Sequence, residues 1–179
     1  LGASGGVGLA AIEIAKACGA IVIACASSKE KLSLCKEHGA DYIINYNEGI
    51  FRHKLKRIAP NGVHIVIDLV GGNVSLDSVK CLSWNGRIVI VGFASGEIPS
   101  IPANRLLLQN ANACGLYWGE LAYKEPKLIG ESFLKLNEWY DLGLLKPRIH
   151  KVIALKDASE ALKILKNRSV IGKIVIDCR

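Results

Sequence analysis

The first eight residues of the chain hold four glycines and are the strongest candidates for chemistry in the sequence. They read LGASGGVG, and the apolar residues that follow Val7 recur at helical spacing. Backbone N–H groups at the start of a helix have no partner inside it and carry the positive end of its dipole, so glycines there let an anion approach closely. The stretch therefore predicts a phosphate-binding loop at the start of a helix.

Two glycine motifs fit this loop, and neither is specific alone. Ala3, Gly5 and Gly8 follow the dinucleotide-binding pattern G-x-G-x-x-G, with alanine in place of the first glycine. Gly2, Gly6 and Gly8 follow G-x-x-x-G-x-G equally well. A turn whose glycines serve only the packing of the helix is the alternative.

The second motif suggests a short-chain dehydrogenase, and Tyr123 and Lys127 have the spacing Y-x-x-x-K. That pair needs a helix to bring both side chains to one face, and Pro126 disfavours a helical conformation at the residue before it. We interpret this match as a coincidence.

Small or polar residues also follow each of four predicted strands. They are Ser27 and Ser28, Asn45 and Tyr46, Gly71 and Gly72, and the segment 92–96. In an open parallel sheet, ligands bind beyond the carboxyl ends of the strands. Four such strand ends together predict a groove for a dinucleotide.

The residues about 20 positions beyond the glycines indicate which dinucleotide, because an acidic side chain there would bind the adenosine ribose of NAD. Here Ser27, Ser28 and Lys29 end the strand. Glu30 comes one turn into the helix, and Lys31 follows it. Hydroxyls, helix-start amides and a lysine suit the extra phosphate of NADPH, so we expect NADP(H). A role of Ser28 as a helix cap, with the lysines solvated, is compatible with this prediction.

Alternating strands and helices must position these residues. Strands are predicted over residues 20–28, 42–46, 64–72, 86–96 and 111–118, and helices over residues 29–38, 50–58, 75–81 and 106–109. The alternation predicts an α/β fold, a Rossmann doubly wound parallel sheet. It loosens in the tail, where a helix over 127–141 and one over 157–166 flank HKVIAL and precede GKIVID. We expect a Rossmann domain over residues 1–146 and a separate C-terminal segment over 147–179.

Length and composition restrict the class of protein. The 179 residues fit one domain, and 50% of them are hydrophobic. The strand that normally precedes a phosphate loop would lie before Leu1, so we expect a fragment. A targeting signal would lie upstream too, which leaves cytoplasm and mitochondrion open. Since no apolar run approaches the roughly 20 residues that span a bilayer, a soluble protein is expected.

The cysteines, histidines and charges predict neither a metal site nor a nucleic-acid partner. Six cysteines and four histidines show no metal-ligand spacing, and we interpret the thiols as buried hydrophobes of a reducing compartment. The net charge is +7, and residues 146–179 hold nine Lys or Arg against three Asp or Glu. The basic tail indicates either a solvated surface or attraction to a phosphate-rich ligand. Nucleic acid is not favoured as that ligand, because the sequence lacks a recognition motif and aromatic platforms.

The combined motifs resemble one known family. GASGGVG, ASSKEKLSLCKEHGADYIINY, VIDLVGG, GRIVIVGFASGEIPSIPAN and GKIVI resemble the zeta-crystallin-like quinone oxidoreductase branch of the medium-chain dehydrogenase/reductase superfamily. The resemblance implies an NADPH-carrying Rossmann domain and an N-terminal GroES-like domain to which residues 147–179 return. It also implies zinc-independent hydride transfer to quinones or enones, largely by positioning, and it assigns no catalytic residue.

The resemblance further implies cofactor contacts and an assembly. The pyrophosphate would lie at Ser4, Gly5, Gly6 and Val7, and the adenosine phosphate at Ser27, Ser28, Lys31, Tyr46 and Arg168. The adenosine side would meet Val70, Gly71 and Gly72, and the nicotinamide would meet Gly92, Phe93, Ala94, Leu116, Tyr117 and Trp118. Relatives dimerise through a strand that corresponds to residues 112–117. A non-catalytic NADP(H)-binding fragment, or a remnant without turnover, is the alternative function. The parent protein is expected to be the enzyme, and the isolated fragment is expected to be inactive.

Overall fold

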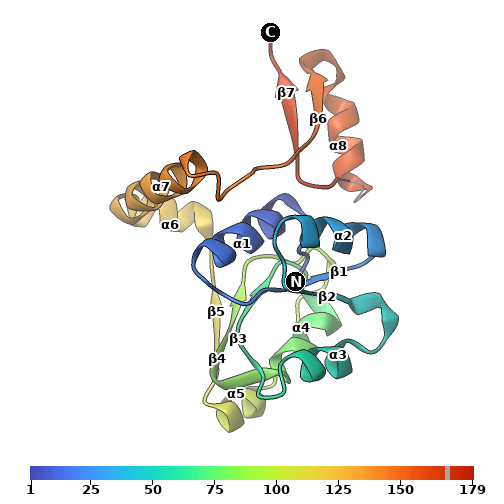
Figure 1. Cartoon of the computed structure of the whole chain (residues 1–179), viewed down its shortest axis with the longest axis vertical. Coiled ribbons are helices and arrows are strands. Elements are labelled where there is room, and N and C mark those ends of the chain that lie inside the picture. Colours follow the sequence, from blue (N-terminus) through green and yellow to red (C-terminus); the bar gives the residue numbers. More distant parts are fainter. Residues whose placement is uncertain (168–169) are drawn as a thin grey trace.

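The computed structural model describes residues 1–167 and 170–179 as parallel strands that alternate with helices (Figure 1). The strands are β1 (Ile23–Ala26), β2 (Tyr42–Asn45), β3 (Val63–Asp68), β4 (Leu82–Ile90), β5 (Asn112–Gly115), β6 (Ile149–Ala154) and β7 (Lys173–Asp177). The helices are α1 (Gly6–Ala17), α2 (Lys29–Glu37), α3 (Phe51–Ile58), α4 (Gly72–Val79), α5 (Ala103–Gln109), α6 (Trp118–Lys124), α7 (Pro126–Asp141) and α8 (Ala158–Lys166), with 3-10 turns η1 (Tyr46–Glu48) and η2 (Leu155–Asp157). All four strand pairings are parallel, which confirms the predicted α/β fold class.

The five predicted Rossmann strands form two ladders. β1 pairs with β2, and β3, β4 and β5 follow in that order in the second ladder. Residues 1–3 join the ladders, because the Leu1 amino group donates to the Ile67 carbonyl (2.7 Å) and the Ala3 amide donates to the Cys25 carbonyl (3.0 Å). Within the described residues no strand lies between β1 and β3, and Ile65 of β3 is 64% exposed.

The helices begin and end where local chemistry allows. The Ser28 hydroxyl accepts a hydrogen bond from the Lys31 amide (3.3 Å), which makes Ser28 the N-cap of α2 as expected. Gly39 follows the end of α2 with a φ of 98°, a conformation that favours glycine. α3 ends before Pro60, whose ring disfavours a helical residue in front of it.

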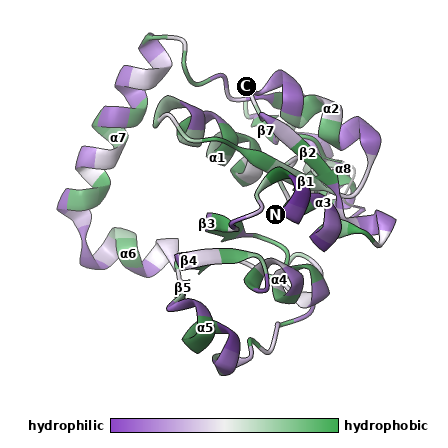
Figure 2. Ribbon diagram, turned by 60° about the horizontal axis from the view of Figure 1, so that its bottom comes forward, coloured by the Kyte–Doolittle hydropathy of each residue, from purple (hydrophilic) through white to green (hydrophobic). Residues whose placement is uncertain are grey.

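Three apolar clusters hold the helices on the strands, which are mainly hydrophobic in Figure 2. Leu9 and Ile12 of α1 pack with Leu34 and Cys35 of α2. The second cluster joins β1, β2 and α3, and the third joins β3, α4 and β4. Each fully buried leucine or isoleucine contributes about 1.5–3 kcal/mol, so the positions of α1 and α4 against the sheet are well determined.

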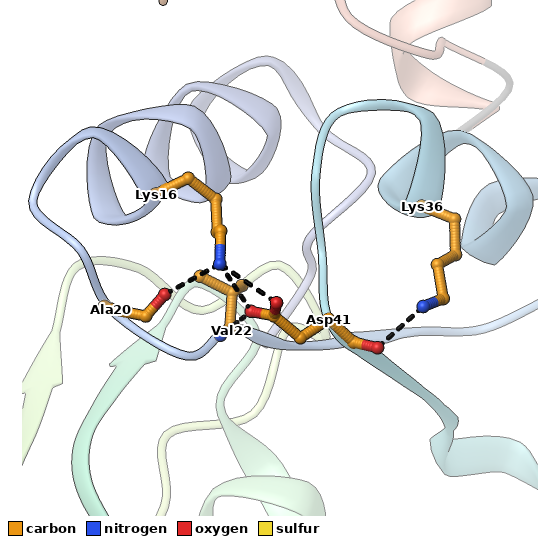
Figure 3. A network of polar contacts seen from close by, with 5 residues as sticks. All are labelled: Lys16, Ala20, Val22, Lys36 and Asp41. Carbon is orange, nitrogen blue, oxygen red and sulfur yellow. Dashed lines mark hydrogen bonds and ion pairs between the residues drawn. The ribbon is translucent and has the colours of Figure 1, made fainter.

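A network of polar contacts fixes the start of β2 (Figure 3). The Lys16 ammonium lies 2.9 Å from both carboxylate oxygens of Asp41, and the Val22 amide donates to the same carboxylate (2.7 Å). The Lys36 ammonium donates to the Asp41 carbonyl (2.6 Å). Asp41 thereby ties α1 and α2 to the segment before β1.

The region after β5 differs from the sequence-based expectation. The predicted strand 111–118 is shorter, since β5 ends at Gly115 and Trp118 begins helix α6, which the sequence did not predict. The ring of Trp118 meets the ring of Phe133 edge to face, with centroids 6.5 Å apart. This contact joins two consecutive helices, and local propensity does not reveal it because it depends on how α6 and α7 pack against each other.

The tail forms a separate ladder of β6 and β7 with α8 beside it (Figure 1). Its contacts with the first part of the chain include a hydrogen bond to a side chain and a backbone bridge. The Lys146 amide donates to the Glu13 carboxylate (3.0 Å), and Gly172 forms an isolated parallel bridge with Gly5. The division into residues 1–146 and 147–179 stays a prediction.

Candidate functional site

The predicted phosphate loop precedes α1 as a compact turn. The Gly5 amide donates to the Gly2 carbonyl (3.3 Å), and Gly2 has a φ of 71°. A Cβ at residue 8 would lie 2.5 Å from the Gly2 carbonyl oxygen, so only glycine lets the helix pack so closely against the loop. A Cβ at Gly5 would meet only the Gly2 oxygen, at 3.7 Å, which leaves the outer side of this residue accessible.

The first turn of α1 offers N–H groups at this loop. Gly6, Val7 and Gly8 are its first three residues, and amides at these positions have no partner inside a helix. Ser4, directly before the N-cap Gly5, is buried, with 7% of its surface exposed. A phosphate group would fit at this place, because the glycine loop lets it approach closely. The helix dipole and the amides of the first turn would then attract its negative charge.

The ends of β1 and β2 meet beside one another. The Asn47 side-chain amide donates to the Ser27 carbonyl (3.1 Å), which holds η1 against the end of β1. Ser27, Ser28 and Tyr46 are thus brought to the same edge of the first ladder. Arg168, which the resemblance adds to this group, lies outside the described residues.

Sequence reasoning missed a carboxylate at this edge. Glu48 lies in η1, two residues after Tyr46, and forms an ion pair with Lys54 of α3. The hydrogen bond from the Lys54 ammonium holds the pKa of the Glu48 carboxyl below its ordinary value. Its negative charge is therefore largely compensated where we predict the adenosine phosphate.

The loop after β3 is held by Asp68, which the sequence analysis also missed. This carboxylate is fully buried and accepts hydrogen bonds from the amides of Val70 (2.9 Å) and Gly71 (3.1 Å). Its other oxygen accepts one from the Ser75 hydroxyl. The signal in the sequence was an acidic residue between an apolar strand and a Gly-Gly pair, in VIDLVGG.

The loops after β3 and β4 are joined to each other. The amides of Ala94 and Ser95 donate to the carbonyls of Leu69 (3.0 Å) and Val70 (2.9 Å). Gly71 has a φ of 78°, and a Cβ there would lie 2.4 Å from the Glu97 carbonyl oxygen. Segments 70–72 and 92–94, which the sequence analysis predicted to line one groove, thus lie together in the structure.

The remaining predicted residues follow β5. The Leu116 amide donates to the Ile90 carbonyl (2.9 Å), which keeps Leu116 beside the end of β4. Tyr117 is 74% exposed, and the Trp118 ring packs against Phe133 of α7.

The tail reaches the phosphate loop through Gly172 and Lys173. A Cβ at Gly6 would lie 2.6 Å from Cε of Lys173 and 3.0 Å from the Gly172 carbonyl oxygen, so the Lys173 side chain runs along the first residue of α1. The sequence analysis assigned no role to Lys173.

Within residues 1–167 and 170–179, no group of three or more His, Cys, Asp or Glu side chains has a metal-binding arrangement. No helix in these ranges has both the length and the apolar character needed to cross a membrane.

Comparisons with known proteins place the fold in a family. A family model described as zinc-binding dehydrogenase matches residues 6–133. "Quinone oxidoreductase-like protein 2 homolog" of Nematostella vectensis is 42% identical over 99% of this chain and 49% of that protein, and "quinone oxidoreductase-like protein 2" of Mus musculus is 37% identical over 99% and 51%. The solved Escherichia coli quinone oxidoreductase complexed with NADPH has a TM-score of 0.88 at 28% identity, over 99% of this chain and 55% of that one. The chain spans about half the length of the curated relatives that it matches.

Proposed function

The chain belongs to the zinc-binding dehydrogenase family, within the medium-chain dehydrogenase/reductase superfamily, and on this premise we propose that it is the cofactor-binding part of an NADPH-dependent reductase of quinones or enones. The observation that carries the proposal is the common edge formed by the phosphate loop and the ends of four strands. A likeness to a quinone oxidoreductase solved with NADPH supports the choice of cofactor.

The residues present fit a dinucleotide in both shape and charge. Ser4, Gly5, Gly6 and Val7 would hold the pyrophosphate through the amides of the loop and the first turn of α1. Ser27, Ser28, Lys31 and Tyr46 would hold the adenosine phosphate, and Val70, Gly71 and Gly72 would flank the adenosine. Arg168 of the tail would also reach the adenosine phosphate. The residues that would face the nicotinamide are Gly92, Phe93, Ala94, Leu116, Tyr117 and Trp118.

In this proposal, hydride transfer depends mainly on how the chain positions the bound cofactor. NADPH, when bound, supplies the hydride. The chain's own part would be to fix the nicotinamide with the loop after β4, which backbone hydrogen bonds and glycines hold against the loop after β3. The proposal includes zinc independence, which rests on the dispersed cysteines and histidines of the sequence.

The same proposal includes a homodimer through β5. This strand is an edge of its ladder, and Asn112 and Ala113 are exposed there. Pairing of β5 with its copy would extend the ladder across two subunits. A monomeric mass in solution contradicts this part.

The cofactor test compares NADPH and NADH by calorimetric titration of the chain and of Lys31→Ala. We expect the chain to prefer NADPH, and Lys31→Ala to lose about tenfold in NADPH affinity with little change for NADH, since one charged contact to the phosphate is removed. Lys124→Ala on α6 is the matched control and should leave both affinities unchanged. Binding of neither nucleotide, or equal binding of both, overturns the cofactor proposal.

Turnover needs its own test, because binding without turnover is the alternative function. NADPH oxidation is followed through the loss of the near-ultraviolet absorbance of the reduced nicotinamide, after addition of a quinone and then of an enone. Oxidation that depends on the acceptor supports the reductase. Because the chain is proposed to be only the cofactor-binding part, the assay is also made after a GroES-like domain of a relative has been joined to the chain. Tight NADPH binding without oxidation by either acceptor in that joined protein supports the non-catalytic alternative.

A further inference from the structure

A cleft outside the proposed cofactor site lies where the tail meets the ends of helices α1 and α2. Its lining comes from the second half of α1, the end of α2 and residues 143–148, which lead into β6. None of the positions assigned to the dinucleotide belongs to this lining. The ionisable side chains of the cleft are Glu13, Lys16, Glu37, His38, Lys146 and Arg148.

A buried carboxylate holds the ring of His38 in this cleft. Nδ1 of His38 lies 2.6 Å from Oε1 of Glu13, and the second oxygen of Glu13 accepts a hydrogen bond from the Lys146 amide (3.0 Å). The side chains of His38 and Glu13 are only 11% and 9% exposed. Because an ionised carboxylate can only accept hydrogen bonds, Nδ1 of His38 carries the proton of this contact.

The other ring nitrogen of His38 is the group that indicates a ligand. In the part of the chain that the structure describes, Nε2 has no hydrogen-bond partner. It is not enclosed either, since every fully buried side-chain nitrogen or oxygen in that part has a partner. A carboxylate that orients a histidine through Nδ1 fixes the direction in which Nε2 can bind another group. His38 is therefore a largely buried and oriented side chain with one open binding position at the cleft.

The charges that share the cleft with His38 favour an anion. The ion pairs found within residues 1–167 and 170–179 use neither Lys146 nor Arg148, whereas they do use Lys16. The carboxylate of Glu37 is also outside these pairs. Two cations thus stand against one carboxylate, and a protonated His38 would add a third positive charge.

We propose that this cleft binds a small oxoanion, a phosphate or a carboxylate, through Nε2 of His38 and the side chains of Lys146 and Arg148. The imidazolium form of His38 would donate from both nitrogens, to Glu13 and to the anion. The anion would then link the end of α2 to the tail. This site is separate from the proposed cofactor function and does not depend on it.

The test follows the histidine rings by proton–nitrogen NMR spectroscopy of the full chain at about pH 7. Sodium phosphate and sodium butyrate are added in separate titrations at constant ionic strength, and His38→Gln identifies the signals of His38. We expect the Nε2 signal of His38 to move toward its protonated position, because a bound anion stabilises the imidazolium. The anion that binds more tightly identifies the class of oxoanion. An Nε2 signal that neither anion moves overturns the proposal.

Two variants remove one cation each from the cleft. Lys146→Met and Arg148→Met keep an apolar side chain, and both positions are exposed, so the variants should fold. Each should bind the preferred anion about tenfold more weakly, because one charge-assisted hydrogen bond is lost. Lys156→Met removes another exposed lysine of the tail and should leave the affinity unchanged. Equal affinity of the parent chain, Lys146→Met and Arg148→Met also overturns the proposal.

The phosphate loop could bind phosphate as well, so the two sites must be told apart. Phosphate that shifts the backbone amides of residues 5–8 without moving the His38 ring contradicts a site at the cleft. ADP is titrated as a ligand of the phosphate loop, and its affinity should be the same for the parent chain and for Arg148→Met. If the chain binds neither ADP nor NADPH but phosphate or butyrate still moves the His38 signal, the cofactor proposal fails and the cleft proposal stands.

Discussion

The carboxylate of Glu13 lies 2.6 Å from Nδ1 of His38, and both side chains are largely buried. Glu13 belongs to the middle of α1, and His38 caps the end of α2. The second oxygen of Glu13 accepts a hydrogen bond from the Lys146 amide, where the tail begins. One side chain therefore connects three segments of the chain.

Replacing Glu13 with alanine is expected to lower the free energy of unfolding by about 2–3 kcal/mol, because the buried His38 ring and the Lys146 amide both lose their partner. Urea denaturation followed by circular dichroism measures the change. Glu120→Ala is the control, since its ion pair with Lys124 is solvent-exposed and should contribute less than about 1 kcal/mol. Equal effects of the two substitutions contradict the prediction.

Asp68→Asn is expected to loosen the loops after β3 and β4. The asparagine side chain has one oxygen to accept hydrogen bonds, whereas Asp68 accepts three from Val70, Gly71 and Ser75. We expect a loss of about 1–3 kcal/mol in the free energy of unfolding and a several-fold weaker NADPH affinity. Ser75→Ala removes one of the three bonds and should show a smaller change of the same sign. A stability loss with unchanged NADPH affinity shows that Asp68 does not position the cofactor loops.

The cysteines should fall into distinct reactivity classes. Cys18 and Cys178 are exposed, whereas Cys25, Cys35 and Cys81 are buried. Burial raises the pKa of the Cys35 thiol to about 11 and also raises the pKa of Cys25 and Cys81, so their thiolates are scarce at neutral pH. Titration with a disulfide reagent at pH 8 should modify Cys18 and Cys178 first and the three buried thiols only after unfolding. Fast modification of Cys35 in the folded chain is the contrary outcome.

The raised pKa of Cys35 also predicts an alkaline loss of stability. An unfolded thiol ionises near pH 9, while the folded one resists ionisation until about pH 11. Its contribution to folding is therefore fully present below pH 9 and decreases as the pH rises toward 11. Unfolding midpoints of the chain and of Cys35→Ala, compared from pH 8 to pH 11, should converge across this window.

Asp41 predicts an effect of opposite sign at acid pH. The hydrogen bonds from the Lys16 ammonium and the Val22 amide hold the pKa of the Asp41 carboxyl below its ordinary value. The carboxylate therefore stabilises the fold above the unfolded pKa, and this contribution is lost as the pH falls through the folded pKa. Asp41→Asn should unfold at lower urea concentration than the parent chain at pH 7, and the difference should shrink below about pH 4. A difference that does not depend on pH rules out this linkage.

Local sequence patterns predicted most of the elements, because their signals are local. Ser28 before α2, Gly39 after it and Pro60 after α3 mark boundaries that the structure confirms. The ends of the strands could also be predicted from the sequence, since small and polar residues directly follow the apolar runs. The sequence therefore predicted that segments 70–72 and 92–94 lie near one another, and the hydrogen bonds between their loops agree with this.

The features that the sequence did not reveal depend on contacts between distant segments. Trp118 meets Phe133, and Lys173 meets Gly6, only after the chain has folded. Asp68 could be recognised as an acidic residue before a Gly-Gly pair, but its hydrogen bond from Ser75 needs the helix α4 in place. The division of the five strands into two ladders likewise follows from which neighbours the strands find in space.

In the proposed site, the adenosine phosphate would lie at the ends of β1 and β2 in one ladder, and the nicotinamide would lie at the end of β4 in the other ladder. Residues 1–3 join these halves through the hydrogen bonds of Leu1 to Ile67 and of Ala3 to Cys25. A dinucleotide that contacts both ladders would link them in addition to these hydrogen bonds. Amide protons of β1 and β3 should then exchange more slowly with solvent once the ligand is bound.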